Sequence, residues 1–499
     1  MENAAFLPIG PEVILLAGAL IVILAGVFWS GHRREMGVIA GVALGAAFAL
    51  AVVQWQEVAA DGPGLYFSMR GVELPRTPMV VMDAYSAYGG MLIFAVGLIG
   101  LLAAWRLATT LGMRATEFLA LLLLGVAGLH MMMASANLVM LFLGLETASI
   151  SFYVLAGFTR ERARADEAAT KYFLLGSLSS AVFIYGVALA FASTGSTSIY
   201  GVQGIREFFE GTIVTDPGIL FIAVALMIVG LTFKVSAAPF HQWAPDVYQG
   251  APGGAVGLMS AGVKVAGFAA LGRVLIGGFP SQISDWAPAL AVIAAISMIV
   301  GVVMAIVQDD MKRLLAYSGV AHAGYILTAL VAGIDGIGAM WFYLSTYAFM
   351  LLGAFAVAAA VSGERRGRSS LDSYRGLASR SPELAGALAV LMLGLAGFPF
   401  TAGFIGKVAV FSAAADADYV WLVVLGVLTT VAGLYFYVRV ITLMYMREPV
   451  PVEAPGTLRA DPEPSATTRV VLAVSVAVTV IFGLVPWPLL DFVRDALPL

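Results

Sequence analysis

Three lysines of this sequence lie where a charged side chain is costly. Lys234, Lys264 and Lys407 each occupy the interior of a long apolar run, in a chain with only 12% charged residues. On insertion scales, a lysine at the centre of a membrane-spanning helix costs about 2.5–3.5 kcal/mol. Three such lysines cost about 8–10 kcal/mol, which is comparable with the stability of a whole domain. We infer that these lysines have a function.

The choice of lysine indicates proton chemistry. A guanidinium keeps its proton in proteins, whereas a desolvated ammonium can release it. Glu146, in the run LVMLFLGLETASISFYVL, is the only carboxylate at mid-depth of an apolar run. An anion close to Lys234 would favour the charged lysine, and moving that anion away would favour proton release. Glu146, Lys234, Lys264 and Lys407 are therefore the expected proton-carrying residues.

Weaker candidates for a proton relay each have an ordinary structural alternative; they are His322, His241, Glu117 and Lys171. A buried neutral histidine with one hydrogen bond is common, so both histidines could be core residues. Glu117 could stabilise a helix N-terminus. Lys171 could be one of the basic residues that flank a span on the cytoplasmic side. His130 fits a core residue better than a relay, and Asp83 fits an interfacial position better than a catalytic one.

Long apolar helices must position these residues. Hydrophobic residues make up 61% of the 499, and the mean hydropathy is +0.94, which exceeds what a soluble domain can cover. About 14 runs reach the length of about 20 residues that an α-helix needs to cross hydrocarbon. The sequence thus predicts an all-α polytopic membrane protein with spans near 7–29, 37–55, 79–104, 116–134, 136–158, 172–192, 217–238, 253–276, 287–307, 314–333, 337–361, 385–412, 418–445 and 470–489.

The first run, 7–29, has no basic region before it and no small-residue cleavage site after it. We therefore interpret it as a span and not as a signal peptide. The chain contains no cysteine, so disulfides, iron–sulfur clusters and thiolate metal sites are excluded. Its four histidines are scattered, which disfavours a haem or zinc site. No cofactor is expected on this chain, and any redox chemistry belongs to a partner.

Basic residues indicate the orientation. They gather in loops that follow odd-numbered spans, among them Arg33, Arg34, Arg160, Arg162, Arg164, Arg365, Arg366 and Arg368. Because loops rich in Lys and Arg stay in the cytoplasm, both termini are expected to face outward.

Two spans contain prolines where a helix should continue. The seventh reads GLTFKVSAAPFHQWAPDVY, with Pro239 and Pro245, and the twelfth reads LAGFPFTAGFIGKVAVF, with Pro399. A proline frees a backbone carbonyl, which is tolerated at membrane depth only beside protein or a watery cavity. The alternative is a simple kink in a packed helix. Because the breaks lie five spans apart, we predict two inverted five-helix repeats, spans 4–8 and 9–13.

Several segments resemble a known family. FKVSAAPFHQWAPDVYQGAP, LFLGLETASISFYVLAGF, QDDMKRLLAYSGVAHAGY and YRGLASRSPELAGAL followed by GFPFTAGFIGKVAVF are similar to the antiporter-like subunits of respiratory complex I, which are related to Mrp-type cation/proton antiporter subunits. The resemblance covers roughly residues 75–445. Within the family it is closest to the subunit N type, because DVYQGAP follows the first break, Lys407 stands where subunit M has glutamate, and the chain stops soon after the last span.

The resemblance implies a row of buried charges along the membrane midplane. Glu146 would pair with Lys234, Lys264 would connect, and Lys407 would be the distal site. It further implies four segments: 1–115 with the first three spans, repeats at 116–276 and 287–445, and 446–499 with the last span. The expected partners are the lipid bilayer and other membrane subunits of the complex, and not nucleic acid.

The implied function is proton translocation in a bacterial inner membrane. It would be driven by electron transfer from NADH to quinone, with FMN and iron–sulfur clusters in other subunits. The alternatives are an Mrp-type sodium/proton antiporter subunit and a structural subunit whose charges only hold helices together. Three ionisable lysines disfavour the structural reading, because serine or asparagine would join helices at a lower cost.

Overall fold

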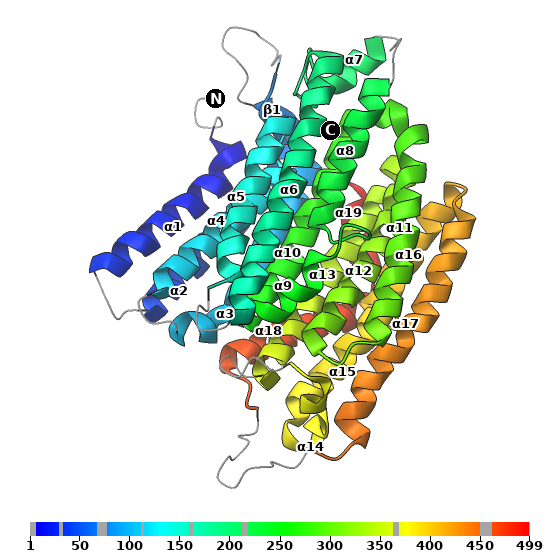
Figure 1. The fold of residues 1–499 in the computed structure, drawn as a ribbon. Coiled ribbons are helices and arrows are strands. Elements are labelled where there is room, and N and C mark those ends of the chain that lie inside the picture. Colours follow the sequence, from blue (N-terminus) through cyan, green and yellow to red (C-terminus); the bar gives the residue numbers. More distant parts are fainter. Residues whose placement is uncertain are drawn as a thin grey trace.

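The structure is a computed structural model in which the chain forms one helical bundle (Figure 1). It describes residues 6–28, 33–66, 77–110, 114–158, 163–211, 218–362, 369–449 and 462–498. Of the basic residues used above to predict orientation, Arg160, Arg162, Arg365, Arg366 and Arg368 lie outside the described residues.

The described elements are almost all helices. The α-helices are α1 Gly10–Phe28, α2 Arg33–Asp61, α3 Ala84–Thr110, α4 Ala115–Met133, α5 Leu138–Ala156, α6 Ala163–Thr194, α7 Ile205–Gly211, α8 Gly218–Lys234, α9 Trp243–Gly250, α10 Gly253–Gly272, α11 Ile283–Ile306, α12 Met311–Leu330, α13 Ile337–Ser362, α14 Leu377–Arg380, α15 Pro382–Ala396, α16 Ala402–Asp416, α17 Val420–Met446, α18 Ala466–Leu484 and α19 Trp487–Arg494. A π-helical segment, Arg273–Gly278, continues α10, and the strands are β1 Gly64–Tyr66 and β2 Val80–Met82.

The length and surface of these helices suit a membrane. Among the described residues, 11 helices are long and apolar enough to cross one, and α8 and α15 are apolar but shorter. Side chains on the outside of the bundle are themselves apolar; on α17, Leu428 is 62% exposed and Val431 is 66% exposed. Hydrocarbon is the solvent that such a surface requires. The predicted all-α polytopic class is confirmed.

The centre of the bundle is α10, which carries Lys264. Every residue of this helix after Gly253 is buried, and the helix packs against α3, α4, α8 and α13. A lysine in the middle of α10 is therefore surrounded by other helices, and snorkelling to a membrane surface does not explain it.

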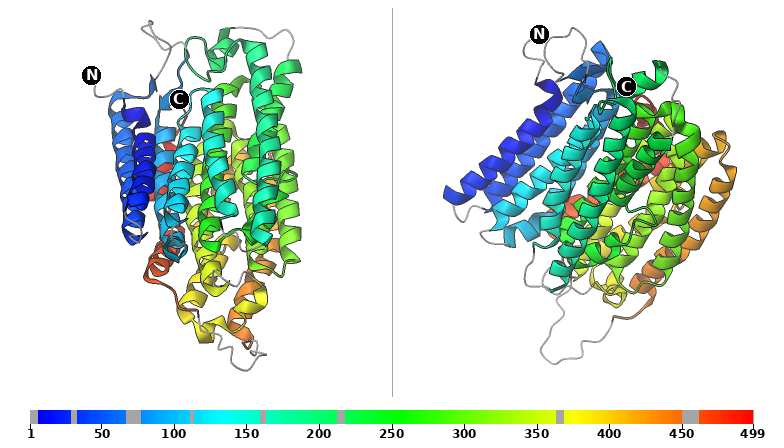
Figure 2. Two further views of the ribbon diagram at one scale, coloured as in Figure 1. Left: turned by 60° about the vertical axis from the view of Figure 1, so that its left-hand side comes forward. Right: turned by 45° about the horizontal axis from the view of Figure 1, so that its top comes forward.

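One end of the bundle is closed by a small layer of extended chain, and we name it the hairpin end. Strands β1 and β2 pair antiparallel there, with Gly64 opposite Met82. The backbone of β2 also bonds to the turn between α4 and α5, where Val81 N donates to Ala134 O at 2.8 Å. The start of α1 and the end of α19 lie at the hairpin end, whereas α14 lies at the opposite end (Figures 1 and 2).

Two apolar helices end inside the bundle, at the segments where the prolines predicted breaks. Helix α8 ends at Lys234 and α9 begins at Trp243, so eight residues separate the two helices, and Pro239 lies in this interruption. Pro245 does not contribute to it, because it lies in the first turn of α9, where proline is tolerated. Helix α15 ends at Ala396, and α16 begins at Ala402, after Pro399. The two interrupted helices run in opposite directions, since α8 starts at the hairpin end and α15 at the α14 end.

Candidate functional site

A group of hydroxyl side chains surrounds Lys234, the last residue of α8. Its Nζ atom donates to Ser149 Oγ at 2.8 Å and lies 3.3 Å from the Tyr153 hydroxyl. Ser149 and Tyr153 lie on the same face of α5 as Glu146, because residues three, four and seven apart share a helix face. Lys234 is 3% exposed, so its ammonium is buried against neutral oxygens.

Glu146 lies near Lys234 without touching it. The Glu146 carboxylate accepts a hydrogen bond from Ser180 on α6, and it interacts electrostatically with Lys234. Within the described part of the chain, no salt bridge joins Lys234 to any carboxylate. The structure therefore brings the expected pair into electrostatic range, and the contact of each partner is a hydroxyl group.

Lys264 binds a carbonyl group freed by the first helix break. Its Nζ atom donates to Val235 O at 2.6 Å and to Gly319 O at 3.0 Å. Val235 directly follows the last residue of α8, and the final carbonyls of a helix have no partner within the helix. The neighbouring carbonyl, Phe233 O, accepts from the indole of Trp243 at 3.0 Å. Lys264 thus joins the broken end of α8 to α12.

Lys407 makes the corresponding contact at the second break. Its Nζ atom donates to Ala396 O, the last carbonyl of α15, at 3.0 Å. The ammonium also lies 4.6 Å from the centre of the Tyr325 ring, a favourable position for a cation. Gly397 (φ +79°) leaves the space, because a Cβ atom there would come within 2.9 Å of Lys407 Cδ. Lys407 is 5% exposed.

His322 lies between Lys264 and Lys407, within electrostatic range of both. Its Nδ1 atom is 2.8 Å from the Tyr343 hydroxyl, and its Nε2 atom is 3.0 Å from the Tyr437 hydroxyl. The Tyr437 hydroxyl in turn lies 2.5 Å from Ser318 Oγ. These groups can both donate and accept a proton, and they form a hydrogen-bonded cluster within electrostatic range of both lysines.

Tyr343 and Tyr437 were not expected from the sequence. A tyrosine within an apolar run needs a hydrogen-bond partner for its hydroxyl when it is buried, and this was the available signal. The signal is weak, because tyrosine is also frequent at membrane interfaces. Only the meeting of α12, α13 and α17 reveals that both hydroxyls face His322.

The other candidates lie apart from this group. His241 lies in the interruption after α8, with its ring 6.1 Å from that of Tyr317. Glu117 is exposed in the first turn of α4, where Thr116 donates to it at 3.2 Å. Lys171 forms ion pairs with Glu167 at 2.6 Å and with Asp246 at 2.8 Å. In the described residues none of the three hydrogen-bonds to a buried lysine of the site, so their relay roles stay predictions.

His130, which the sequence favoured as a core residue, is buried and has an acidic partner. Its Nδ1 atom lies 2.7 Å from Glu12 Oε1 on α1. Asp83 is also buried and binds Arg273, a partner that the sequence could not show; its interfacial position in the membrane stays a prediction.

The chemistry of the site follows from its partners. Lys234, Lys264 and Lys407 have hydroxyl and carbonyl oxygens as their hydrogen-bond acceptors. Such acceptors bind an ammonium without a full counter-charge, so less free energy holds the proton on the lysine than in an ion pair. No cluster of His, Cys, Asp or Glu suited to a metal ion occurs in the described ranges. The arrangement can therefore carry protons.

The comparisons with known proteins identify the family of the chain. A family model described as NADH:quinone oxidoreductase/Mrp antiporter, TM, matches residues 135–433, which include all four of the principal site residues. The chain belongs to this family.

Members of the family resemble the chain over nearly its whole length. NADH-quinone oxidoreductase subunit N of Trichlorobacter lovleyi is 38% identical and covers 98% of this chain and 96% of its own length. NADH-quinone oxidoreductase subunit N 1 of Solibacter usitatus is 40% identical and covers 88% of this chain and 87% of its own. A chain of respiratory complex I from Thermus thermophilus, solved with bound aureothin, is 31% identical with a TM-score of 0.79, covering 96% of this chain and 98% of its own.

Proposed function

We propose that this chain is the subunit N type membrane component of the proton-translocating NADH:quinone oxidoreductase, respiratory complex I. It moves protons across the membrane through Glu146, Lys234, Lys264 and Lys407. Electron transfer from NADH to quinone in other subunits drives the movement. The chain is a subunit of a translocase, and other subunits would perform the redox chemistry; without cysteine it offers no thiolate ligand for an iron–sulfur cluster.

The observation that carries this proposal is the set of three buried lysines, Lys234, Lys264 and Lys407, for which the described part of the chain shows no salt bridge. Lys264 and Lys407 each donate to a carbonyl at a helix break, and Lys234 is the last residue before the first break. A charge that only joined helices would be stabilised by a counter-charge. Neutral partners keep the two protonation states of lysine closer in free energy, which a proton carrier requires.

Internal symmetry supports the two repeats, residues 116–276 and 287–445. A Cβ atom on Gly128 of α4 would lie 2.5 Å from Ala148 N on α5, and one on Gly301 of α11 would lie 2.3 Å from Ala321 N on α12. Gly128 and Gly301 lie at the same distance in sequence from the last residues of α4 and α11. Ala148 and Ala321 likewise lie at the same distance from the first residues of α5 and α12. The same close helix crossing is thus built twice.

The symmetry also relates the two polar centres. Ser149, which accepts from Lys234, directly follows Ala148, and His322 directly follows Ala321. Glu146 lies two residues before Ala148, and Gly319 lies two residues before Ala321, so these two positions correspond. The Gly319 carbonyl accepts a hydrogen bond from Lys264. Each repeat therefore offers one polar centre, and only the first carries a carboxylate.

The membrane topology is part of the proposal. If α8 with α9 and α15 with α16 each cross once, the helices account for 14 spans, with the broken ones seventh and twelfth. The basic loops would place the α14 end in the cytoplasm and the hairpin end, with both termini, on the periplasmic side of a bacterial inner membrane. The segments 1–115 and 446–499 would flank the repeats.

Partners supply the redox chemistry. The subunit would lie among other membrane subunits of the complex, including its antiporter-like siblings, and would not bind nucleic acid. FMN, iron–sulfur clusters, NADH and quinone would be bound by other subunits. An Mrp-type sodium/proton antiporter subunit is the second candidate function, since the matching family includes that class; the names of the relatives favour complex I.

Purification of the tagged chain from its native membrane tests the assignment. We expect NADH:quinone reductase activity to copurify, and Lys407→Ala to lower NADH-driven proton pumping in vesicles while the complex stays assembled. The reason is that Lys407 is the lysine at the second break. Wild-type pumping by Lys407→Ala would contradict the proton-carrying role. Sodium/proton exchange without NADH oxidation in the purified material would favour the Mrp alternative.

A further inference from the structure

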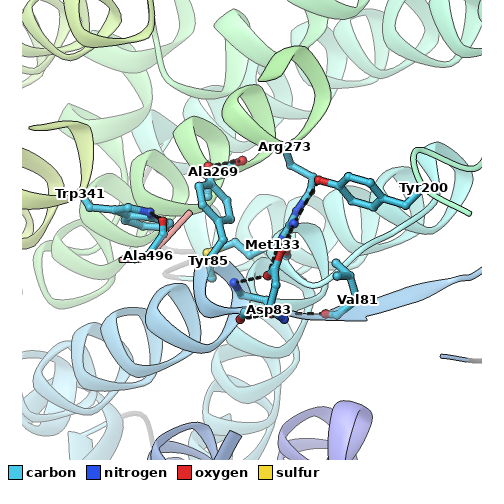
Figure 3. A network of polar contacts seen from close by, with 10 residues as sticks. Val81, Asp83, Tyr85, Met133, Tyr200, Ala269, Arg273, Trp341 and Ala496 are labelled. Carbon is cyan, nitrogen blue, oxygen red and sulfur yellow. Dashed lines mark hydrogen bonds and ion pairs between the residues drawn. The ribbon is translucent and has the colours of Figure 1, made fainter. Parts of the chain in front are cut away.

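A second buried charge lies at the hairpin end, where Arg273 meets Asp83 (Figure 3). Arg273 directly follows α10, and Asp83 lies between β2 and α3. The side chains are 0% and 2% exposed. The pair thus lies on the same helix as Lys264, about 13 Å further toward the hairpin end at 1.5 Å per residue.

All five N–H groups of the Arg273 guanidinium have acceptors. Nη1 donates to Asp83 Oδ2 and to the Tyr200 hydroxyl, the latter at 3.3 Å. Nη2 donates to Asp83 Oδ1 at 2.9 Å and to Met133 O at 2.8 Å. Nε donates to Met133 O at 3.2 Å. No donor of this group is left to hold a water molecule.

Aromatic rings enclose the guanidinium. The centre of the Tyr85 ring lies 4.7 Å from Arg273 Cζ, and that of Tyr200 lies 5.8 Å away. The Tyr85 hydroxyl donates to Ala269 O at 2.8 Å, between Lys264 and Arg273 along α10. Tyr85 and Tyr200 are both 0% exposed. At the hairpin end, α10 is therefore covered by tightly packed side chains whose guanidinium donors all have acceptors.

A matching arginine at the α14 end is left open. Arg439 on α17 donates a hydrogen bond to Ile306 O, the last carbonyl of α11. Arg273 in the same way donates to Met133 O, the last carbonyl of α4. Arg439 also pairs with an aspartate, Asp309, at 2.7 Å. This pair is 31% and 85% exposed. The two arginines thus bind the C-terminal ends of α4 and α11, which occupy corresponding places in the two repeats. Of the two, Arg273 is buried and Arg439 is partly exposed.

We propose that the Asp83–Arg273 pair is a proton-tight seal that closes the first repeat toward the hairpin end. The inference rests on the proposed function, since it concerns protons that reach Lys264. A proton relay needs groups that can take up and release a proton, and a guanidinium does neither. A guanidinium with all its donors in use also leaves no donor for a chain of water. Protons that arrive at Lys264 then cannot leave along α10 toward the hairpin end, and they stay available for Lys407.

Passive proton leak tests the seal without any turnover. Inverted vesicles that contain the native complex receive a pH gradient, and its decay is followed in the absence of NADH. Arg273→Ala would leave Asp83, Tyr200 and Met133 O without their donor around a new cavity, which water can enter. We expect the gradient to decay about tenfold faster, which corresponds to a barrier lowered by about 1.4 kcal/mol.

Two further variants separate a seal from a structural clamp. Arg273→Lys keeps the charge and has only three donors, so it should fold more readily and still leak. Asp83→Leu with Arg273→Met replaces the pair by apolar groups of similar volume, which is often tolerated, and should stay tight. Arg439→Ala is the matched control at the open end and should decay like the wild type.

Reductase activity with an uncoupler shows which variants have assembled. Decay at the wild-type rate in assembled Arg273→Lys vesicles would overturn the seal, even if Arg273→Ala fails to assemble. Adding Lys264→Ala to a leaking variant should suppress the leak. A leak that persists there would keep the seal but contradict a route through Lys264, so the failure of the proposed function is distinguishable.

Discussion

Arg273 and Lys264 lie on one continuous helical segment, and both are buried, yet their surroundings differ. Arg273 has the Asp83 carboxylate and uses every donor. Lys264 donates to two backbone carbonyls, and within the described ranges no salt bridge joins it to a carboxylate. The paired cation is fixed in charge and position, whereas the lysine can exist in two protonation states. If Lys264 carries protons as proposed, then the partner, and not burial alone, separates a structural charge from a functional one.

The largest effect should come from breaking the pair. Asp83→Asn leaves the Arg273 charge buried without an anion, and such a change costs about 3–5 kcal/mol. We expect the complex to denature at a lower temperature when thermal unfolding is followed in detergent. Asp309→Asn, at the exposed counterpart, is the control and should change little. Equal thermal stability of Asp83→Asn and wild type would show that the Asp83–Arg273 ion pair does not stabilise the fold.

Changing Lys264 should lower pumping more than it lowers stability. Lys264→Met removes a buried charge but leaves Val235 O and Gly319 O without this donor, a cost of about 1–3 kcal/mol for each carbonyl, so assembly is checked by reductase activity. Lys264→Arg keeps the charge but cannot release a proton. We expect both variants to pump at least about tenfold more slowly in NADH-energised vesicles, a difference of about 1.4 kcal/mol. Normal pumping by Lys264→Arg would mean that the charge alone is needed at this position.

Sequence reasoning located the helices and both breaks because these depend on local features. Apolar runs mark a membrane helix wherever they occur, and Pro239 and Pro399 interrupt a helix through their own missing amide. A lysine in an apolar run is visible for the same reason. Pro245 was misjudged, since its effect depends on whether it falls inside a helix or in its first turn.

The pairing of side chains could not be predicted, because it depends on how distant helices meet. Asp83 and Arg273 lie 190 positions apart, and neither residue carries a local signal of the other. The Tyr437 hydroxyl reaches His322 from 115 positions away. Glu146 and Lys234 were expected to form a pair, and sequence could not reveal that Ser180 and Ser149 would be their direct hydrogen-bond partners.

The smallest effect concerns coupling between Glu146 and Lys234. Their charges interact through space, and Ser149 stands one turn beyond Glu146 on the same helix and binds Lys234. Removing the negative charge of Glu146 should therefore change how readily Lys234 releases its proton. Because the residues are not in contact, we expect a coupling energy near the lower end of the range for interacting groups, about 0.5–1 kcal/mol.

A double-mutant cycle on pumping rates in assembled complex measures this coupling. If Glu146 acts through Lys234, Glu146→Gln should have little further effect once Lys234→Ala is present. If the two act independently, the losses should add in free energy. Ser149→Ala sharpens the result, since it removes the hydroxyl that binds Lys234 and leaves the carboxylate in place. Strictly additive losses would show that Glu146 acts in another step and does not set the proton affinity of Lys234. The hydroxyl groups that accept from Lys234 would then set this affinity without Glu146.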